Sequence, residues 1–264
     1  MSHWYKRDGS PCYEVPNKSK PGEMRKTKLG DARILDLLPS VTGILDMMAK
    51  PGLDRWKQEQ IILACIKNPI QYGETEEVYA KHVSEAAKEI SEKAASLGTE
   101  VHNEIEQSLI LMENPDVFVV PKPYKHEQTG PIIESFMEWL PSEIQEVVKL
   151  EDPFASPLGY GGKIDIIYET NTGRSILADF KTQSTKPGKP VNSYNQHGMQ
   201  LAAYAKGTNR WEHRLKIIIL STTEPGRIEI VDWTDRKEEM WKLFEACLTI
   251  WKITKKYDPS WERE

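Results

Sequence analysis

Cysteine is scarce in this chain, and the residues Cys12, Cys65 and Cys247 are far apart in its 264 positions. Three cysteines at such spacing predict no disulfide framework and favour a reducing compartment, so we expect a cytoplasmic protein. No apolar run reaches the length of a membrane-spanning helix, and the first residues carry no signal-peptide core. Internal repeats, low-complexity tracts and clear linkers are also missing. With 39% hydrophobic and 28% charged residues, the chain has the composition of a soluble globular enzyme with no membrane partner.

Positive charge is not in excess, since the net charge is −5, but the charges are unevenly distributed. Residues 1–28 hold seven Lys and Arg against three Asp and Glu, and residues 204–216 hold four against one. Residues 74–106 hold nine Glu against three Lys, which is typical of a solvated helix face. The two basic segments bracket the central residues described next and fit a track for phosphates.

Two carboxylates and a lysine lie in neighbouring strand-like runs near the middle of the chain. Asp165 lies in an apolar run over 160–168, and Asp179 and Lys181 lie in a second run over 175–182. A turn-like segment separates the runs, so the pattern predicts a β-hairpin with Asp179 and Lys181 on one face. Carboxylates bind hard divalent cations, and a nearby lysine can steer a water or a phosphate oxygen. The alternative is an exposed cross-strand pair of Asp and Lys, which is common on hairpins.

A predicted helix over 195–205 follows the hairpin after a loop rich in Gly, Pro and Lys. Gln200 and Tyr204 are four residues apart and therefore share one face of this helix. Alone, such a pair is typical of an ordinary half-exposed helix face. Downstream of a hairpin with two carboxylates, it favours a functional site.

The order Gly-x-x-Asp, Asp-x-Lys and Gln-x-x-x-Tyr resembles the RecB-type branch of the PD-(D/E)XK nuclease superfamily. Upstream, the segment 97–106 is similar to the Gly-x-x-x-His helix of that branch. Segments 38–45 and 53–56 are similar to the Pro-Ser-Val-Thr-x-Ile-Leu and Leu-x-x-Trp segments of phage exonucleases and the mitochondrial genome maintenance exonuclease. The resemblance spans about residues 38–205, and five pieces in the right order make it fairly specific.

The resemblance implies a site for Mg²⁺ or Mn²⁺. The ligands would be the carboxylates of Asp165 and Asp179, the backbone carbonyl of Phe180 and the imidazole of His102, which favours Mn²⁺ somewhat. Without the resemblance, His102 would be interpreted as a histidine at the edge of an apolar helix stripe. Some members of the branch carry an iron–sulfur cluster held by four cysteines, several of them near the C-terminus. Only Cys247 lies there, so we expect no iron–sulfur cluster.

The resemblance also implies roles for the remaining motif residues. Lys181 would orient the attacking water or help to deprotonate it, and Gln200 and Tyr204 would fix the water, the lysine or the DNA backbone. Glu151 precedes the hairpin where many members have an acidic residue. It is either a second-metal or supporting carboxylate, or a glutamate on the surface of a strand.

Contacts with nucleic acid are expected along the same segments. Glycines at 161 and 162 would let the backbone approach the strand closely. A stacking and phosphate track would be formed by Trp4, Tyr5 and Trp56 together with the basic segments. The alternative for Trp56 is a place in the helical core. The residues expected to bind nucleic acid are Ser40, Thr42, Trp56, Gly162, Lys163 and Thr182.

The order of elements predicts an α/β protein with a mixed central β-sheet flanked by helices, a restriction-endonuclease-like core, and an N-terminal helical part. We expect residues 1–130 to hold a hairpin-like segment and the helical part with the His helix, and residues 131–264 to form the nuclease core, all integrated into one unit. Strands are expected at 146–151, 160–168, 175–182, 215–220 and 227–233, and helices over 40–51, 53–66, 74–113 with a break at Gly98, 131–140, 195–205 and 235–255.

The resulting hypothesis is a metal-dependent DNA exonuclease that acts on single strands or DNA ends in replication, recombination or repair. The resemblance implies a phage protein in a bacterial host, with DNA and a phage recombinase or single-strand-binding protein as partners. One alternative is a structure-specific endonuclease, and another is a non-catalytic DNA-binding member of the fold. The intact Asp/Asp/Lys set argues against the last. A sequence-specific endonuclease would need a recognition domain, which we do not see.

Overall fold

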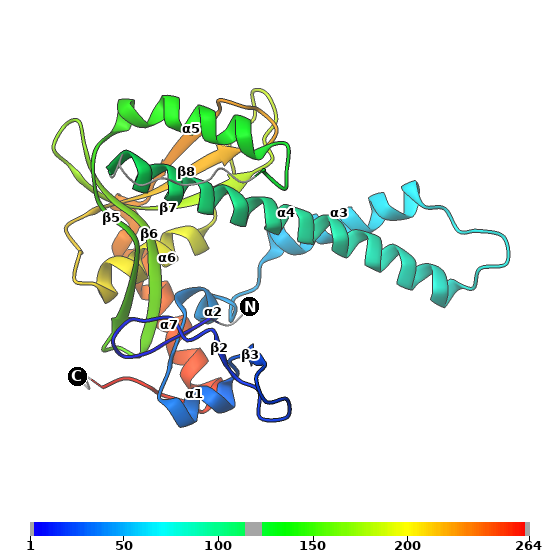
Figure 1. Ribbon diagram of the computed structural model, residues 1–264, viewed down its shortest axis with the longest axis horizontal. Coiled ribbons are helices and arrows are strands. Elements are labelled where there is room, and N and C mark those ends of the chain that lie inside the picture. The colour runs from blue at the N-terminus through cyan, green and yellow to red at the C-terminus, as the bar shows by residue number, and fades with distance from the viewer. Residues whose placement is uncertain (1–2, 114–122, 262–264) are drawn as a thin grey trace. The chain divides into compact units, whose positions relative to one another are not determined.

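The computed structural model describes residues 3–113 and 123–261 (Figure 1). The chain divides into two compact units. We call residues 1–48 and 134–264 the sheet unit, and residues 49–133 the helical unit. The chain leaves the sheet unit after its first 48 residues and returns to it within α5 (Thr129–Glu143).

This division differs from the one expected at residue 130, because the first 48 residues belong to the sheet unit. The physical reason is backbone pairing and helix packing. Strand β1 (Trp4–Tyr5) pairs with β4 (Leu38–Pro39), and Ser40 forms a bridge to Gly161 in the large sheet. Helix α2 (Val41–Leu45) packs against the two helices that cover that sheet.

The sheet unit is built on five strands in the order β5-β6-β7-β8-β9. Only β7 and β8 run parallel; the other neighbours are antiparallel. The parallel pair needs a crossover, and α6 supplies it. The predicted fold class, a mixed sheet flanked by helices, is confirmed. The bounds are β5 (Ile144–Ser156), β6 (Tyr160–Thr170), β7 (Ser175–Gln183), α6 (Asn195–Gly207), β8 (Arg214–Ser221), β9 (Ile228–Asp232), η1 (Thr234–Arg236) and α7 (Lys237–Lys255).

Both faces of the central strands are buried, which explains their nearly continuous apolar sequence. On one face α6 packs on β6, β7 and β8, and α7 packs on α6 (Figure 1). On the other face Phe136 of α5 meets Phe180 of β7 edge to face, with ring centroids 5.6 Å apart. The strands are therefore held rigidly between two apolar layers, which positions any side chain that β6 and β7 present to α6.

The N-terminal segment contains more structure than the sequence predicts. The expected hairpin is present as β2 (Glu14–Pro16) and β3 (Met24–Lys26). Helix α1 (Leu29–Leu35) was not predicted, because Gly30 and the short apolar pattern weaken its signal. The predicted helix over 40–51 is shorter than expected, spanning Val41–Leu45, and its N-cap Ser40 accepts a hydrogen bond from the Gly43 N–H at 3.0 Å.

The helical unit contains α3 (Pro51–Lys67) and α4 (Glu76–Glu113), which pack side by side (Figure 1). Ala64, Val83 and Ala87 form the small core between them. The break expected at Gly98 does not occur, since α4 runs through it. Among the residues that the structure describes, no helix is both long and apolar enough to cross a membrane.

Candidate active site

The candidate site lies where the ladder between β6 and β7 ends. The last registered pair is Ile166 with Ala178, so Asp165 and Asp179 come next, at the point where the two strands stop pairing. Asp165 is 8% exposed and Asp179 is 1% exposed. The backbone N–H of Phe180 donates to Asp165 Oδ2 at 2.9 Å, where a ladder hydrogen bond would otherwise continue. The end of the ladder thus brings two buried carboxylates together.

Lys181 completes this group. Its ammonium forms an ion pair with Asp179, and both side chains lie on the face that α6 covers. Burial raises the pKa of Asp165, and the charge of Lys181 together with the Phe180 N–H only partly opposes that effect. Burial would lower the pKa of Lys181, but Asp179 and Asp165 outweigh it and raise that pKa, so the lysine stays charged. The exposed Asp/Lys pair, which was the alternative interpretation of this hairpin, does not occur.

Helix α6 places Gln200 and Tyr204 over the carboxylates. Gln200 Nε2 donates to Asp179 Oδ1 at 2.7 Å and to Tyr204 Oη at 2.8 Å. Both side chains are buried, so the alternative of a half-exposed helix face does not hold. Burial raises the pKa of Tyr204 well above its usual value, and the two carboxylates raise it further, so the phenol stays protonated. The sequence-predicted Asp165, Asp179, Lys181, Gln200 and Tyr204 therefore form one connected group.

His197 is a residue of this region that the sequence interpretation missed. It lies on α6 one turn before Gln200, and the spacing of His197, Gln200 and Tyr204 puts all three on one helical face. The pKa of His197 is lowered to about 4, mainly by burial and also by the charge of Lys181, with Asp179 opposing both effects. The imidazole is therefore neutral at neutral pH. The three- and four-residue spacing on α6 was the signal that could have identified it.

Glu151 and Lys163 form an ion pair beside the carboxylates. The β5–β6 register pairs Leu150 with Ile166 and Asp152 with Ile164, which puts Glu151 opposite Asp165. Glu151 has a φ of 49°, a left-handed conformation that is strained for a residue other than glycine. Its place is thus beside the site, in contact with a lysine, and the alternative of an unpaired surface glutamate does not apply.

The two glycines of β6 have a packing role within the protein. A Cβ on Gly162 would lie 2.7 Å from a ring carbon of Phe154 and 2.9 Å from one of Tyr204. A Cβ on Gly161 would lie 2.8 Å from Cβ of Tyr5. Both glycines are buried, so the space that their missing side chains leave is filled by aromatic rings of the protein. These contacts give a packing reason for glycine at the two positions, and the contact of Gly162 with nucleic acid stays a prediction.

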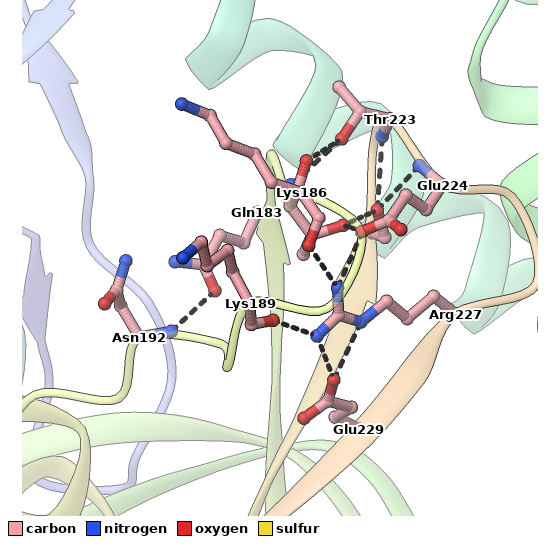
Figure 2. Close-up of polar contacts among 10 residues, drawn as sticks. Gln183, Lys186, Lys189, Asn192, Thr223, Glu224, Arg227 and Glu229 are labelled. Carbon is pink, nitrogen blue, oxygen red and sulfur yellow. Dashed lines mark hydrogen bonds and ion pairs between the residues drawn. The ribbon is translucent and has the colours of Figure 1, made fainter.

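A braced loop connects the hairpin to α6, and Figure 2 shows its anchor, Arg227. Lys186 and Lys189 are the ends of a turn closed by a 3.0 Å bond from the Lys189 N–H to the Lys186 carbonyl. The Arg227 guanidinium donates to both carbonyls, at 3.0 Å to Lys186 and 2.5 Å to Lys189, and also to the carboxylates of Glu224 and Glu229 (Figure 2). One arginine thus fixes the loop that joins Lys181 to Gln200.

The other predicted nucleic-acid contacts are scattered over the two units. Ser40 is buried at the bridge to Gly161, Thr42 is exposed on α2, and Thr182 is half-buried on β7. Trp4 and Tyr5 are 3% exposed, so neither offers the open ring face that the stacking track required. Trp56 on α3 and His102 on α4 belong to the helical unit and are half-buried. The metal role of His102 and the DNA contact of Trp56 stay predictions.

The donor chemistry of the group fits a hard divalent cation. Asp165 and Asp179 offer carboxylate oxygens, and Mg²⁺ in proteins is commonly held by one or two carboxylates with water and substrate phosphate filling the other positions. Within the described ranges, no cluster of three or more His, Cys, Asp or Glu side chains could hold a metal ion by itself. Any metal here would therefore depend on the Phe180 carbonyl, water or substrate as further ligands.

Comparison with known proteins adds little to this geometry. No protein-family model and no curated protein matches the chain. Among solved structures, the crystal structure of SSO0001 is similar with a TM-score of 0.31 and 16% identity, over 62% of this chain and 64% of that one. The match thus spans less than two thirds of the length of SSO0001. The site is interpreted below from its own geometry.

Proposed function

We propose that this protein is a metal-dependent deoxyribonuclease of the RecB-type PD-(D/E)XK branch, an exonuclease that acts on single-stranded DNA or DNA ends. The observation that supports this most is the group at the end of the β6–β7 ladder, in which the buried Asp165 and Asp179 lie with the half-buried Lys181 and Gln200 of α6 donates to Asp179. Two carboxylates with a charged lysine suit the hydrolysis of a phosphodiester, in which negative charge increases in the transition state.

In this proposal Asp165 and Asp179 hold Mg²⁺ or Mn²⁺ together with the Phe180 carbonyl. The cation would supply a bound water of lowered pKa and offset the charge on the scissile phosphate. Lys181 presents ammonium donors next to Asp179, where they can orient that water or bind a phosphate oxygen. Gln200 keeps the Asp179 carboxylate in one orientation by donating to it, and Tyr204 shares the same amide.

The burial of Asp165 and Asp179 explains why the two carboxylates need Lys181 and Gln200 as partners. Two carboxylates removed from water are stable only when their charges are paired and hydrogen-bonded. The chain supplies those partners itself through Lys181, Gln200 and the Phe180 N–H. The group is therefore held in place before substrate arrives, which is the condition for efficient electrostatic catalysis.

The test is cleavage of end-labelled DNA by the purified protein. Single-stranded and blunt double-stranded oligonucleotides are incubated with Mn²⁺, with Mg²⁺ and with EDTA. We expect mononucleotides or short products from single strands in either metal and intact DNA in EDTA. Binding without any cleavage in Mn²⁺ would instead identify a DNA-binding protein, and defined internal cuts in branched or circular DNA would identify a structure-specific endonuclease.

A further inference from the structure

A concave feature of the sheet unit lies apart from the carboxylates. It is a cavity of about 440 Å³ among β1, β2, β3, the start of α1 and the end of α7. Trp4, Tyr13, Lys28 and Trp251 are among the residues that line it. Its volume is within the range of about 300–1,000 Å³ that small-molecule sites occupy. Its lining includes Trp4 and lysines of the basic segment 1–28, which the sequence assigned to a stacking and phosphate track, but none of the carboxylate-site residues.

Aromatic rings form much of the cavity wall. His3 and Tyr13 are stacked, with ring centroids 4.5 Å apart and an angle of 28° between their planes. Trp4 and Trp251 meet edge to face at 6.2 Å and are almost fully buried, so they form the deeper part of the wall. His3 is exposed and Tyr13 is half-buried, so these two rings are the surface open to a ligand. Rings of this kind bind flat, π-rich ligands by stacking.

Lysines from three elements surround the same cavity. Lys26 on β3, Lys28 at the start of α1 and Lys255 at the end of α7 contribute three positive charges. Glu14, the only acidic residue in the lining, stands opposite Lys26 in the β2–β3 register. Positive charge therefore dominates, and it favours a ligand with an anionic group. An acidic peptide would supply the charge without a flat ring, whereas a nucleotide supplies both.

The cavity is connected to the candidate site through β6. The Ser40 N–H donates to the His3 carbonyl at 3.0 Å, and Ser40 bridges to Gly161. Gly161 precedes Asp165 by four residues, a separation of about 13 Å along the strand. Lys163 lies on β6 between Gly161 and Asp165 and forms an ion pair with Glu151. Burial lowers the pKa of His3, and the charge of Lys163 adds to this effect while it opposes the rise in the pKa of Asp165.

We propose that this cavity binds one nucleotide of a DNA single strand, with the base stacked on the exposed ring of His3, which Tyr13 supports from behind, and its phosphate held by Lys28 and Lys255. The proposal rests on the proposed function and extends it, because the strand that the cavity holds is the one whose backbone is cut at Asp165 and Asp179. The neutral imidazole and the phenol read no base edge, so the subsite accepts any base.

Photo-crosslinking tests the location. Oligonucleotides carrying one 5-iododeoxyuridine at successive positions from the 5′ end are bound in EDTA, irradiated and digested, and the modified peptides are identified by mass spectrometry. We expect one position to crosslink to the peptide that contains His3 and Tyr13, or to Trp251. Efficient binding with crosslinks only to other peptides overturns the proposal, whatever the cleavage assay shows.

Equilibrium binding in EDTA tests the two halves of the subsite separately. His3→Ala should weaken the affinity for a single strand about tenfold without changing its salt dependence, and His3→Phe should restore it, because stacking carries no net charge. Because both lysines hold the same phosphate, Lys28→Ala with Lys255→Ala should lower the slope of log K against log salt by about 0.7, the value for one phosphate contact of a single strand. Lys149→Ala with Lys242→Ala, a pair of exposed lysines of the sheet unit outside the cavity, is the matched control and should change neither quantity.

The remaining outcomes separate the subsite from the enzyme. Unchanged affinity and slope in all the cavity variants, with normal metal-dependent cleavage, refute the subsite and leave the nuclease intact. Another outcome is that thymidine 5′-monophosphate binds to the wild-type protein and fails to bind to the cavity variants while strand binding is unaffected. In that case the cavity is a free-nucleotide site and the proposal is wrong. Absence of both strand binding and cleavage would overturn the proposed function itself.

Discussion

Asp165 is buried, and its carboxylate accepts a hydrogen bond from the Phe180 N–H of the neighbouring strand. Asp165→Asn keeps an oxygen for the Phe180 N–H but loses the negative charge. We expect cleavage to fall about 100-fold or more, because the metal loses a charged ligand. Since burial disfavours the carboxylate, the melting temperature in EDTA should stay the same or rise.

Asp179→Asn should also abolish cleavage, and Asp232→Asn is the matched control for both variants. Asp232 lies on β9 of the same sheet and pairs with Arg214 at its edge. Cleavage and melting curves measured side by side give the comparison. Substantial activity in either site variant, or an equal loss in the control, would show that the carboxylates do not form the catalytic group.

Tyr204 contributes a hydroxyl that accepts a hydrogen bond from the Gln200 amide at 2.8 Å. Tyr204→Phe keeps the ring against Phe154 but frees Gln200 to turn away from Asp179. We expect the unfolding free energy to fall by about 1 kcal/mol, the contribution of one hydrogen bond. Single-turnover cleavage should fall about 10- to 100-fold, because Gln200 no longer holds Asp179 in position.

The control for Tyr204→Phe is Tyr257→Phe. The Tyr257 hydroxyl donates to the carbonyls of Ala32 and Leu37, at 3.0 and 2.9 Å, in the same unit but outside the site. This variant should lose at least as much stability and keep its cleavage rate. A Tyr204→Phe protein that cleaves like wild type would make Tyr204 a packing residue.

At the scale of the element, α6 is held by a glycine in its interior. A Cβ on Gly198 would lie 2.4 Å from Cε3 of Trp233 and 2.8 Å from Cγ of Met240. Gly198→Ala should therefore destabilise the protein by about 1–3 kcal/mol, although alanine is the better helix former. Gly30→Ala, in α1 with no atom within 4 Å of the new Cβ, should stabilise it by about 0.5–1 kcal/mol. Urea denaturation measures both, and equal effects in the two variants would contradict the packing argument.

The braced loop between β7 and α6 gives a second prediction at this scale. Arg227→Ala removes the donors that hold the Lys186 and Lys189 carbonyls and leaves two glutamates without that partner. We expect the unfolding free energy to fall by about 1–3 kcal/mol. The amide of Lys189 should exchange hydrogen faster, and cleavage should slow because the loop connects Lys181 to Gln200.

Arg236→Ala is the control for the loop. Arg236, in η1, is exposed, pairs with Glu239 of α7 and lies over the ring of Trp233 at 5.1 Å from its centroid, so its loss should change stability by at most about 1 kcal/mol. Hydrogen exchange measured by mass spectrometry distinguishes the two variants. Protection of the loop that is unchanged in Arg227→Ala would show that the turn at Pro187 and Gly188 holds its shape alone.

The elements with a clear period were the ones that sequence could predict. The hairpin strands, α3 and α6 lie where alternation or helical spacing placed them, and the Asp165, Asp179 and Gln200 group followed from those placements. The ends of the elements were less predictable. Strand β5 begins two residues earlier and ends five residues later than expected. Two register shifts allow it to stay paired with β6 along the whole length of β6, as far as Tyr160. Contacts made across the fold, such as Arg227 on the loop, leave no local pattern in the chain.

At the scale of the whole molecule, the net charge belongs to one unit. Residues 49–133 hold nine Lys and Arg against fourteen Asp and Glu, which leaves 26 of each sign in the sheet unit. The overall charge of −5 therefore does not oppose binding of phosphates by the sheet unit, where the cavity lysines lie. Net charge alone would have argued against a nucleic-acid substrate, and its distribution removes that argument.

The requirement for a free end is the prediction that belongs to the complete protein. We expect linear single strands to be degraded in Mn²⁺ and covalently closed single-stranded circles of the same sequence to persist. A circle that has been nicked once by another enzyme is the matched control and should be degraded like the linear strand. Rapid cutting of intact circles would identify an endonuclease, and a strong preference for blunt duplexes would move the substrate from single strands to duplex ends.

The left-handed backbone at Glu151 sets stability against charge at one position. Glycine would adopt that φ without strain, and asparagine with little. Glu151 instead supplies a carboxylate to Lys163, opposite Asp165 on the neighbouring strand. In a library of variants at this position, selection for folding and selection for DNA cleavage should therefore enrich different residues.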